Sequence, residues 1–300
     1  MDDNPNYPWN LVSVVIVTYN SSAVIRECLQ SVGAAAEVIV VDNASTDSTC
    51  DEIARVLPAA RIIRNQQNRG FGAAVNQGMA AVETKFGFYF SPDAVLCDGA
   101  MEKLVAAADQ NPNGGLFGPH LRRPDGTQEL YVMGPGEIHH SPMTEMPAGD
   151  FCSWFVMGGF FLCPMSAWHR IGGFDERIFL YVEDVDLSLR ATQAGFSLVI
   201  VPDADVIHAG GQSSTVNWRI KWRKDWHQTW SRLYLEAKHG DPNQAKRDAR
   251  QTVIRHFWKT VIYTLLLRPD RVRGNFAKSN AAWAFLRGKP SHSHRVSNNQ

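Results

Sequence analysis

The stretch Leu11-Val-Ser-Val-Val-Ile-Val17 is an almost continuous apolar run near the start of the 300-residue sequence. A run of this kind predicts a strand that is buried on both faces, as strands are in a parallel sheet. Glu37-Val-Ile-Val-Val41 is a second such run, and residues 61–64 form a short third one. Segments with helical character separate the three. This alternation predicts a doubly wound α/β fold with a mostly parallel sheet.

The same alternation continues along the chain. Residues 119–150 have no clear period, and we expect them to form an irregular loop segment near a ligand site. The remaining segments are predicted as strands at residues 86–90, 115–118, 155–163 and 196–201, and as helices at residues 22–32, 48–57, 73–82, 98–109 and 165–171.

Polar residues end the first two apolar runs. Thr18, Tyr19 and Asn20 follow the first run, and Asp42 and Asn43 follow the second. Ligands of doubly wound sheets bind beyond the carboxyl ends of the strands. Each residue alone is an ordinary helix cap or turn former, but together they predict a polar rim where a ligand binds. The fingerprint G-x-G-x-x-G is absent after the first strand, which argues against a dinucleotide dehydrogenase.

Two further segments carry candidate binding residues. Residues 65–72 contain Gly70, which allows close backbone approach, and Arg69, which offers a planar set of five donors; a flexible loop is the alternative. Asp93 is a lone acid after the strand at 86–90, so it is either a ligand of a hard cation or a turn residue. His208, after the last strand, is either a metal ligand or an ordinary loop histidine.

The segment Phe179-Leu-Tyr-Val-Glu-Asp-Val-Asp-Leu-Ser-Leu-Arg190 places three carboxylates within four positions, at Glu183, Asp184 and Asp186. The apolar spacing predicts a helix that starts near Glu183. Asp186 and Arg190 can pair one turn apart. A carboxylate in the first turn of a helix at the mouth of a cleft can act as a general base. The alternative is that these acids only complement the helix dipole.

Composition is that of an ordinary globular protein, with 44% hydrophobic residues. The five cysteines form no C-x-x-C pair, which predicts reduced thiols and argues against disulfides or structural zinc. The first ten residues are acidic and polar, so we expect no signal peptide. The sequence has no run of 18 apolar residues, so no membrane-spanning helix is expected either.

Charge divides the sequence into two parts. Residues 215–300 contain 18 Lys and Arg against 5 Asp and Glu, whereas residues 1–214 contain 12 against 25. We therefore expect a catalytic or binding domain at 1–214 and a basic helical extension at 215–300, with a disordered polar end from Gly288.

Tryptophans recur every four residues at the start of the extension, among basic residues. A second amphipathic segment is expected at residues 255–267. Basic and aromatic helices suit the surface of an anionic membrane. The alternatives are that the tryptophans pack the helices onto the catalytic domain, or that the basic extension binds nucleic acid. The four tryptophans are Trp218, Trp222, Trp226 and Trp230.

Seven motifs occur together and in order, and they make the chain resemble the family 2 glycosyltransferases with the GT-A fold. The resemblance covers about residues 11–214 and is strongest to the bacterial branch that includes rhamnosyltransferases and galactofuranosyltransferases. The motifs are Val14-Val-Ile-Val-Thr-Tyr-Asn20, Val41-Asp-Asn-Ala-Ser-Thr-Asp47, Asn68-Arg-Gly-Phe-Gly72 with Asn76, Ser91-Pro-Asp93, Gly172-Gly-Phe-Asp175, Glu183-Asp-Val-Asp186 and His208.

The resemblance implies roles for these residues. Asp184 stands at the position of the catalytic base, with Glu183 and Asp186 in support. Asp93 and His208 stand where relatives bind Mn²⁺ or Mg²⁺. The nucleotide site would comprise Thr18, Tyr19, Asn20, Asp42, Asn43, Arg69, Gly70, Asn76, Ser91 and Asp93. In this group Asp42 is suited to accept the imide N–H of uracil or thymine.

The implied reaction is an inverting transfer of a sugar from a nucleoside diphosphate to a hydroxyl of a glycan acceptor. Rhamnose from dTDP-rhamnose is the first expectation, with a lipid-linked acceptor in bacterial surface polysaccharide synthesis. The expected location is cytoplasmic, with peripheral contact to the inner face of the cytoplasmic membrane and no nucleic-acid partner. The alternatives are galactose, galactofuranose or N-acetylglucosamine from a UDP donor, or an inactive nucleotide-sugar-binding protein. Ser91-Pro92-Asp93 replaces the Asp-x-Asp or Asn-Pro-Asp of many relatives, which weakens the expectation of a metal.

Overall fold

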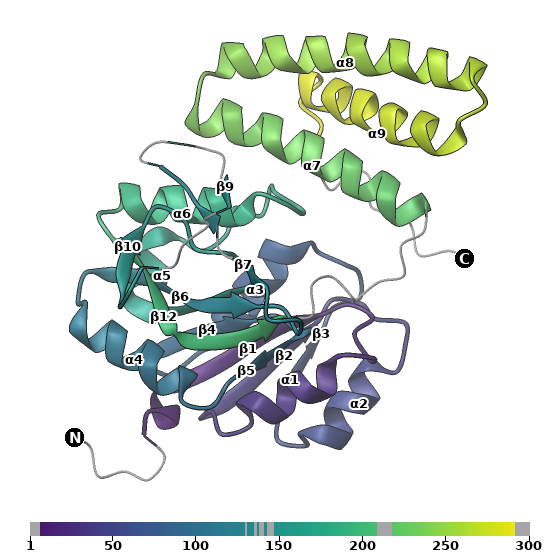
Figure 1. Cartoon of the computed structure of the whole chain (residues 1–300). Helices are drawn as coiled ribbons and strands as arrows, with labels where there is room; N and C mark the ends of the chain where they lie inside the picture. The colour runs from purple at the N-terminus through teal and green to yellow at the C-terminus, as the bar shows by residue number, and fades with distance from the viewer. Residues whose placement is uncertain are drawn as a thin grey trace. The chain divides into compact units, whose positions relative to one another are not determined.

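The chain folds into two compact units. Residues 1–174 and 184–214 form the first, and residues 175–183 and 215–300 form the second. The second unit therefore takes in a short segment that the charge division at residue 214 does not predict. The computed structural model describes residues 7–129, 131–134, 137, 141–142, 147–208 and 218–291 (Figure 1).

The sheet of the first unit confirms the α/β class and has a parallel half and a mixed half. Its strand order is β10-β12-β6-β11-β4-β1-β2-β3, with β5 paired to β12 and β7 to β6. The parallel half is β3-β2-β1-β4, and β11 is antiparallel to both of its neighbours. The strands are β1 (Val12–Thr18), β2 (Glu37–Asp42), β3 (Arg61–Arg64), β4 (Phe86–Phe90), β5 (Ala94–Leu96), β6 (Gly114–Arg122), β7 (Gln128–Glu129), β10 (Phe151–Ser153), β11 (Phe160–Pro164) and β12 (Ser197–His208).

Two short strands in the expected loop segment, β8 (Tyr131–Val132) and β9 (Ser141–Pro142), pair with each other. The expected strand at residues 155–163 is a strand only in its second half, because β11 begins at Phe160 and β10 ends at Ser153, before the expected start. Gly158 and Gly159 lie in the irregular connection between these strands. Gly158 packs closely against Asp184, as described below.

Helices cover both faces of this sheet (Figure 1). The helices α1, α2 and α4 pack on one face around Val14, Val40 and Phe88. The helices α3, α5 and α6 pack on the other face around Val15 and Ile39. Alternate residues of β1 thus enter two different cores, which is why its sequence is apolar throughout. The helices are α1 (Ile25–Val32), α2 (Thr49–Val56), α3 (Phe71–Met79), α4 (Ala100–Gln110), α5 (Met165–Ile171) and α6 (Glu183–Gln193).

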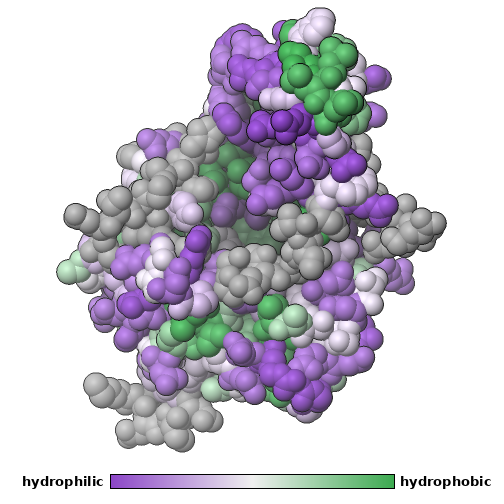
Figure 2. Space-filling model, turned by 45° about the vertical axis from the view of Figure 1, so that its right-hand side comes forward, coloured by the Kyte–Doolittle hydropathy of each residue, from purple (hydrophilic) through white to green (hydrophobic). Residues whose placement is uncertain are grey.

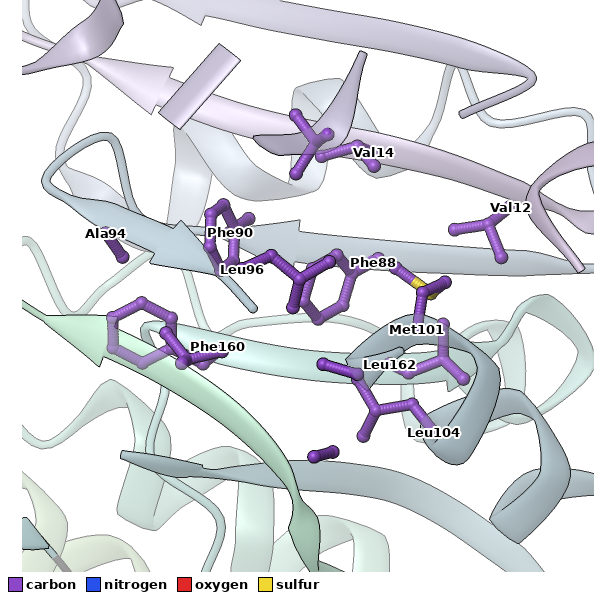
Figure 3. Packing of buried hydrophobic residues seen from close by; sticks show 14 of the residues in the cluster. Val12, Val14, Phe88, Phe90, Ala94, Leu96, Met101, Leu104, Phe160 and Leu162 are labelled. Carbon is purple, nitrogen blue, oxygen red and sulfur yellow. The ribbon is translucent and has the colours of Figure 1, made fainter. Parts of the chain in front are cut away.

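Figure 3 shows the first of these cores, with β4 beside β11 and the side chains of α4 lying across them. Phe88 and Phe90 stack with ring centroids 5.2 Å apart, and Phe90 meets the ring of Phe160 edge-on at 5.8 Å. Met101 and Leu104 of α4 are fully buried against this layer. The packed layer fixes the carboxyl end of β4, where Ser91 and Asp93 follow.

The described part of the second unit contains three helices, α7 (Trp218–His239), α8 (Pro242–Leu265) and α9 (Pro269–Leu286). Trp226 and Trp230 are buried against the alanines of α9, and their indole N–H groups donate to Asn280 Oδ1 and to the backbone oxygen of Lys289, both at 2.9 Å. These two tryptophans therefore pack inside the helical unit itself, an arrangement that none of the expectations describes. Trp218 is 50% exposed and Trp222 half-buried, so the four tryptophans do not share one exposed face, and a membrane contact of the two that are not buried stays a prediction.

Three expectations about the chain as a whole can be compared with the structure. All five cysteines are free, as expected. Across the described ranges, none of the helices has the length and apolar content to cross a membrane. A disordered end is expected from Gly288, but the structure describes the chain as far as Ser291. Ser291 is fully buried, and its hydroxyl hydrogen-bonds to the segment 175–183. Residues 292–300 lie outside the described residues.

Candidate active site

The paired ends of β1 and β2 build the first part of the polar rim. Thr18 and Asp42 are register partners in these parallel strands, so their side chains meet. The Thr18 hydroxyl donates to Asp42 Oδ1 at 3.0 Å, and the Ser45 N–H donates to Oδ2 at 3.1 Å. The Asp42 carboxylate thus accepts a hydrogen bond at each oxygen, and the Cys50 thiol also lies within hydrogen-bond reach of it. Since a carboxylate oxygen accepts two hydrogen bonds, this leaves capacity for a ligand donor such as an imide N–H.

Tyr19 and Asn20 shape the loop that borders this carboxylate. Asn20 has a left-handed backbone with φ of 54°, which asparagine adopts more readily than most residues. Its side-chain oxygen accepts from the Thr46 N–H at 2.8 Å, and its own N–H donates to Ser45 Oγ at 2.8 Å. The Tyr19 N–H donates to Ser21 Oγ at 3.3 Å. These bonds join the loops after β1 and β2.

Asn43 connects this rim to the segment that carries Arg69 and Gly70. Its Nδ2 donates to Asn68 Oδ1 and to the Gly70 oxygen, each at 3.1 Å, and its Oδ1 accepts from the Arg69 N–H at 2.9 Å. Gly70 has φ of 93° and is the residue just before α3, so a side chain there would strain the turn. The Arg69 guanidinium lies 3.5 Å from Gln77 Oε1.

Asn76 lies on α3 and holds the turn between α5 and the acidic helix. Its Nδ2 donates to the Phe174 oxygen at 2.9 Å, and its Oδ1 accepts from the Phe174 N–H at 2.8 Å. Gly72 makes room for the Phe174 side chain, because a Cβ at Gly72 would lie 2.8 Å from Phe174 Cβ. At this position the glycine therefore serves internal packing. Contact of Asn76 with a nucleotide stays a prediction.

Strand pairing brings Asp93 and His208 together from positions far apart in the sequence. His208 at the end of β12 is the register partner of Ala94 in β5, the residue after Asp93. His208 Nε2 lies 3.5 Å from Asp93 Oδ1, and the Ser91 hydroxyl donates to the same oxygen at 2.7 Å. Burial alone would raise the pKa of Asp93, but hydrogen bonds from His208 and Ser91 outweigh it and lower that pKa. A carboxylate and an imidazole thus lie side by side.

This pair fits part of a coordination shell for a divalent cation. A deprotonated carboxylate and an imidazole are both ligands that Mn²⁺ accepts, and a diphosphate can supply oxygens. Within the described residues, no three His, Cys, Asp or Glu side chains gather into a complete metal cage. A metal at Asp93 and His208 would therefore depend on ligands from the substrate.

Asp184 lies in the first turn of α6, and its carboxylate is held at both oxygens. Oδ2 accepts from the Gly158 N–H at 3.3 Å, and Oδ1 accepts from the Val185 N–H at 2.9 Å. Gly158 belongs to the connection between β10 and β11, which lies against this helix at the same point. A Cβ at Gly158 would lie 2.7 Å from Asp184 Cβ. The close approach therefore requires glycine.

Gly158→Ala tests this contact, with Gly159→Ala as its matched control. We expect Gly158→Ala to push Asp184 out of position and to lower turnover by up to about 10²-fold, as small misplacements of catalytic groups do. A Cβ at Gly159 meets only Ser91 Cβ, at 4.0 Å, so Gly159→Ala should be nearly neutral. Steady-state turnover and nucleotide binding, measured for both variants, show whether Gly158→Ala lowers turnover. Equal turnover in the two variants would contradict the positioning role of Gly158.

The other two acids of the cluster have different surroundings. Asp186 is fully buried and forms the expected pair with Arg190, whose Nε donates to Asp186 Oδ2 at 2.8 Å. Arg190 also donates to the Ile171 oxygen at 2.8 Å, so the pair fastens α6 to α5. Glu183 is half-buried. Supporting roles for Glu183 and Asp186 in catalysis stay predictions.

The loop before Asp184 is held by Asp175, the last residue of the motif at 172–175, and by two residues of α7 that the sequence does not single out, Tyr234 and Lys238. Asp175 accepts hydrogen bonds from the Tyr234 hydroxyl and the Lys238 ammonium group, each at 2.8 Å, and pairs with Arg177 at 3.1 Å. Tyr181 and Val182, just before the acidic cluster, have φ of 70° and 61°. A left-handed β-branched residue is a genuine outlier. The turn into α6 is therefore a strained conformation.

Comparison with known proteins adds independent evidence. The family model described as "Glycosyl transferase family 2" matches residues 13–164. The N-acetylglucosaminyl-diphospho-decaprenol L-rhamnosyltransferase of Mycobacterium tuberculosis is 30% identical over 244 residues, with 68% of this chain and 78% of the relative covered. This relative supports the rhamnosyltransferase-like branch of the resemblance.

Solved structures with similar folds are glycosyltransferases at low sequence identity. GalNAc-T7, solved with UDP, GalNAc and Mn²⁺, has a TM-score of 0.59 at 16% identity; 95% of this chain matches, and it spans 57% of that chain. The mannosyltransferase PcManGT of Pyrobaculum calidifontis, solved with GDP-Man and Mn²⁺, has a TM-score of 0.56 at 16% identity, with 93% and 88% covered. These likenesses confirm the expected GT-A fold.

Proposed function

Because the chain belongs to glycosyltransferase family 2, we propose that it catalyses an inverting transfer of a sugar from a nucleoside diphosphate to an acceptor hydroxyl. The observation that carries the proposal is Asp184, a carboxylate held at the start of α6 by Gly158 and Val185. In the same unit, strand ends present Asp42 with Thr18, and Asp93 with His208. The proposed reaction uses a general base, a group that hydrogen-bonds to the nucleoside of the donor, and ligands for a metal ion. Asp184, Asp42 and the pair of Asp93 and His208 fit these three roles.

Asp184 has a defined part in the proposed displacement. Its carboxylate takes the proton from the acceptor hydroxyl while that oxygen bonds to the anomeric carbon. The bond from the anomeric carbon to the diphosphate oxygen breaks, and the bonding electron pair leaves with the nucleoside diphosphate. Because attack and departure occur on opposite faces, one displacement inverts the configuration. Thr18 and Asp42 orient the base of the donor.

A divalent cation belongs to the proposal, with Asp93 and His208 as its protein ligands. When bound, Mn²⁺ or Mg²⁺ neutralises the charge that develops on the leaving diphosphate. The short bond from Ser91 to Asp93 fixes the carboxylate, and the edge-on ring of Phe160, 5.0 Å from that of His208, fixes the imidazole. Both ligands are therefore positioned before the donor binds.

The donor and acceptor are proposed from the mycobacterial relative, whose name states that it transfers L-rhamnose to a lipid-linked N-acetylglucosamine. We infer dTDP-rhamnose as the donor and a lipid-linked glycan in bacterial surface polysaccharide synthesis as the acceptor, met at the inner face of the cytoplasmic membrane. A UDP-linked galactose, galactofuranose or N-acetylglucosamine is the second candidate for the donor. An inactive nucleotide-sugar-binding protein would keep the Asp42 site without turnover.

Thermal unfolding with nucleotides tests the proposal. We expect dTDP or UDP, together with Mn²⁺ or Mg²⁺, to raise the unfolding temperature, whereas GDP and CDP have little effect. A ligand that binds only the folded state at a hundredfold excess over Kd stabilises it by about 2.7 kcal/mol. Asp42→Ala and Asp93→Ala should each reduce the shift. Hydrolysis or transfer assays with dTDP-rhamnose then identify the sugar; no shift with any nucleotide would count against the proposed function.

A further inference from the structure

The helix α8 carries a continuous apolar stripe on its outer surface. The side chains recur at intervals of three and four residues, which places them on one face of the helix. Their exposed fractions run from 36% to 78%. So much exposure is unusual for six large apolar side chains on one face of a helix. Figure 2 shows apolar side chains gathered at one end of the helical unit, beside hydrophilic ones. This α8 stripe consists of Ile254, Phe257, Trp258, Val261, Ile262 and Leu265.

The stripe is separate from the core of the helical unit. Ala245 and Ala249 of α8 are fully buried, and Val253 packs with Ala249 and with Ala282 of α9. These positions lie on the side of α8 that faces its neighbours, roughly opposite the stripe. The turn after α8 extends the apolar surface, because Leu266 and Leu267 are 60% and 85% exposed. Among the described residues of the unit, none covers this surface.

Basic residues flank the apolar surface. Arg255 and Lys259 are exposed on α8 beside the stripe, and Arg268 and Arg271 are exposed just after the turn. Residues 250–278 contain seven Lys and Arg against one acid, Asp270. A helix with Trp, Phe and Leu on one side and Lys and Arg beside them suits the boundary between lipid headgroups and acyl chains. The positive charge complements anionic headgroups.

We propose that the α8 stripe and the turn at residues 265–267 dock on the surface of an anionic lipid bilayer. The leucines and aromatic rings enter the outer acyl region, while Arg255, Lys259 and Arg268 contact phosphate groups. A second copy of the chain fits less well, because the basic residues of two copies would face each other and repel. Docking would hold the enzyme where a lipid-linked acceptor lies. Only this link to the acceptor rests on the proposed function, because the docking surface itself is inferred from α8.

Vesicle cosedimentation tests the proposal directly. We expect the full chain to bind vesicles of phosphatidylcholine with phosphatidylglycerol and to bind phosphatidylcholine vesicles much more weakly. The double variant Leu265→Glu/Leu267→Glu should lose at least about 10²-fold in partitioning, since two leucines no longer leave water. Each basic residue near an anionic surface strengthens binding about fivefold. Arg255→Gln/Lys259→Gln should therefore lower partitioning about 25-fold, and salt should reproduce that loss.

A control with the same added charge separates docking from general repulsion. Gln110→Glu/Asn113→Glu places two acids on exposed positions at the end of α4 in the first unit, and binding should fall far less than in the leucine variant. Circular dichroism and transfer to a water-soluble acceptor should be unchanged in Leu265→Glu/Leu267→Glu. Equal partitioning of the leucine variant and wild type would overturn the proposal. So would light scattering that shows a dimer lost in that variant, with no vesicle binding by wild type.

The proposed docking and the proposed chemistry fail separately. Nucleotide-dependent stabilisation without vesicle binding would retain the transferase proposal and reject the membrane surface. Vesicle binding without any nucleotide effect would retain the membrane surface and reject the transferase mechanism.

Discussion

We expect Asp184→Asn to lower turnover by about 10²–10⁴-fold, the usual contribution of a positioned general base. The amide is nearly isosteric with the carboxylate and can still accept a hydrogen bond from the Gly158 or Val185 N–H, so α6 and the connection at 158 should keep their places. What the amide cannot do is take a proton from the acceptor hydroxyl. The loss should therefore appear in kcat, while the nucleotide raises the unfolding temperature as in wild type.

Asp186→Asn is the contrasting variant, because it changes the fully buried acid of the same helix, two residues after Asp184. Loss of a charge partner for Arg190 should lower stability by up to about 3 kcal/mol, and turnover measured well below the unfolding temperature should change little. Asp203→Asn, at an exposed position on β12, should change neither quantity. Full activity of Asp184→Asn would remove Asp184 from the role of base. A large loss of turnover in Asp186→Asn with unchanged stability would place the base there instead.

The sequence predicts the parallel half of the fold well because local pattern and tertiary role coincide there. In the run at 11–17, one set of alternate residues enters one core and the other set enters the second core. Because both sets are mostly apolar, burial on both faces is visible in the sequence itself. The side chains of Thr18 and Asp42 meet because parallel strands end at the same edge, which also follows from the pattern. The pairing of Asp186 with Arg190 is a local helical interaction and is predicted for the same reason.

Long-range contacts could not be predicted in this way. Glycines at 72 and 158 look like flexible or ligand-approach positions, and only the structure shows that they make room for Phe174 and Asp184. The tryptophans of α7 resemble a membrane stripe until α9 is seen to cover Trp226 and Trp230 with alanines. The apolar surface that stays exposed lies on α8 instead. A single sequence does not reveal which of two amphipathic helices is covered by a third.

The contacts of the segment 175–183 could not be predicted either, and they lead to the last prediction. It precedes Asp184 directly, yet it is held by the helical unit. Phe179 stacks on His227 of α7 at 4.8 Å, its N–H donates a hydrogen bond to Ser291 Oγ at 3.0 Å, and the Ser231 hydroxyl donates to the Leu180 oxygen at 2.9 Å. These contacts keep the strained turn before α6 in place, since backbone strain persists only where the surroundings over-determine it.

We expect Asp175→Asn to lower kcat by up to about 10²-fold with little change in the KM for the donor, because it loosens this segment and displaces Asp184. Burial alone would raise the pKa of Asp175, but hydrogen bonds from Arg177, Lys238 and Tyr234 hold that pKa well below its ordinary value. The carboxylate therefore adds stability that is fully present above the unfolded-state pKa of about 4 and is lost as the pH falls toward the folded-state value.

The difference in unfolding temperature between wild type and Asp175→Asn should accordingly be constant from neutral pH to about pH 5 and shrink in stronger acid. Tyr234→Phe removes one donor and should give a smaller loss of kcat. Asp270→Asn, whose side chain is 82% exposed in the same unit, is the matched control and should leave kcat unchanged. If Asp175→Asn lowered the unfolding temperature and left kcat intact, Asp175 would stabilise the helical unit without positioning the base. A selective loss of kcat would mean that the helical extension serves catalysis through the segment it holds.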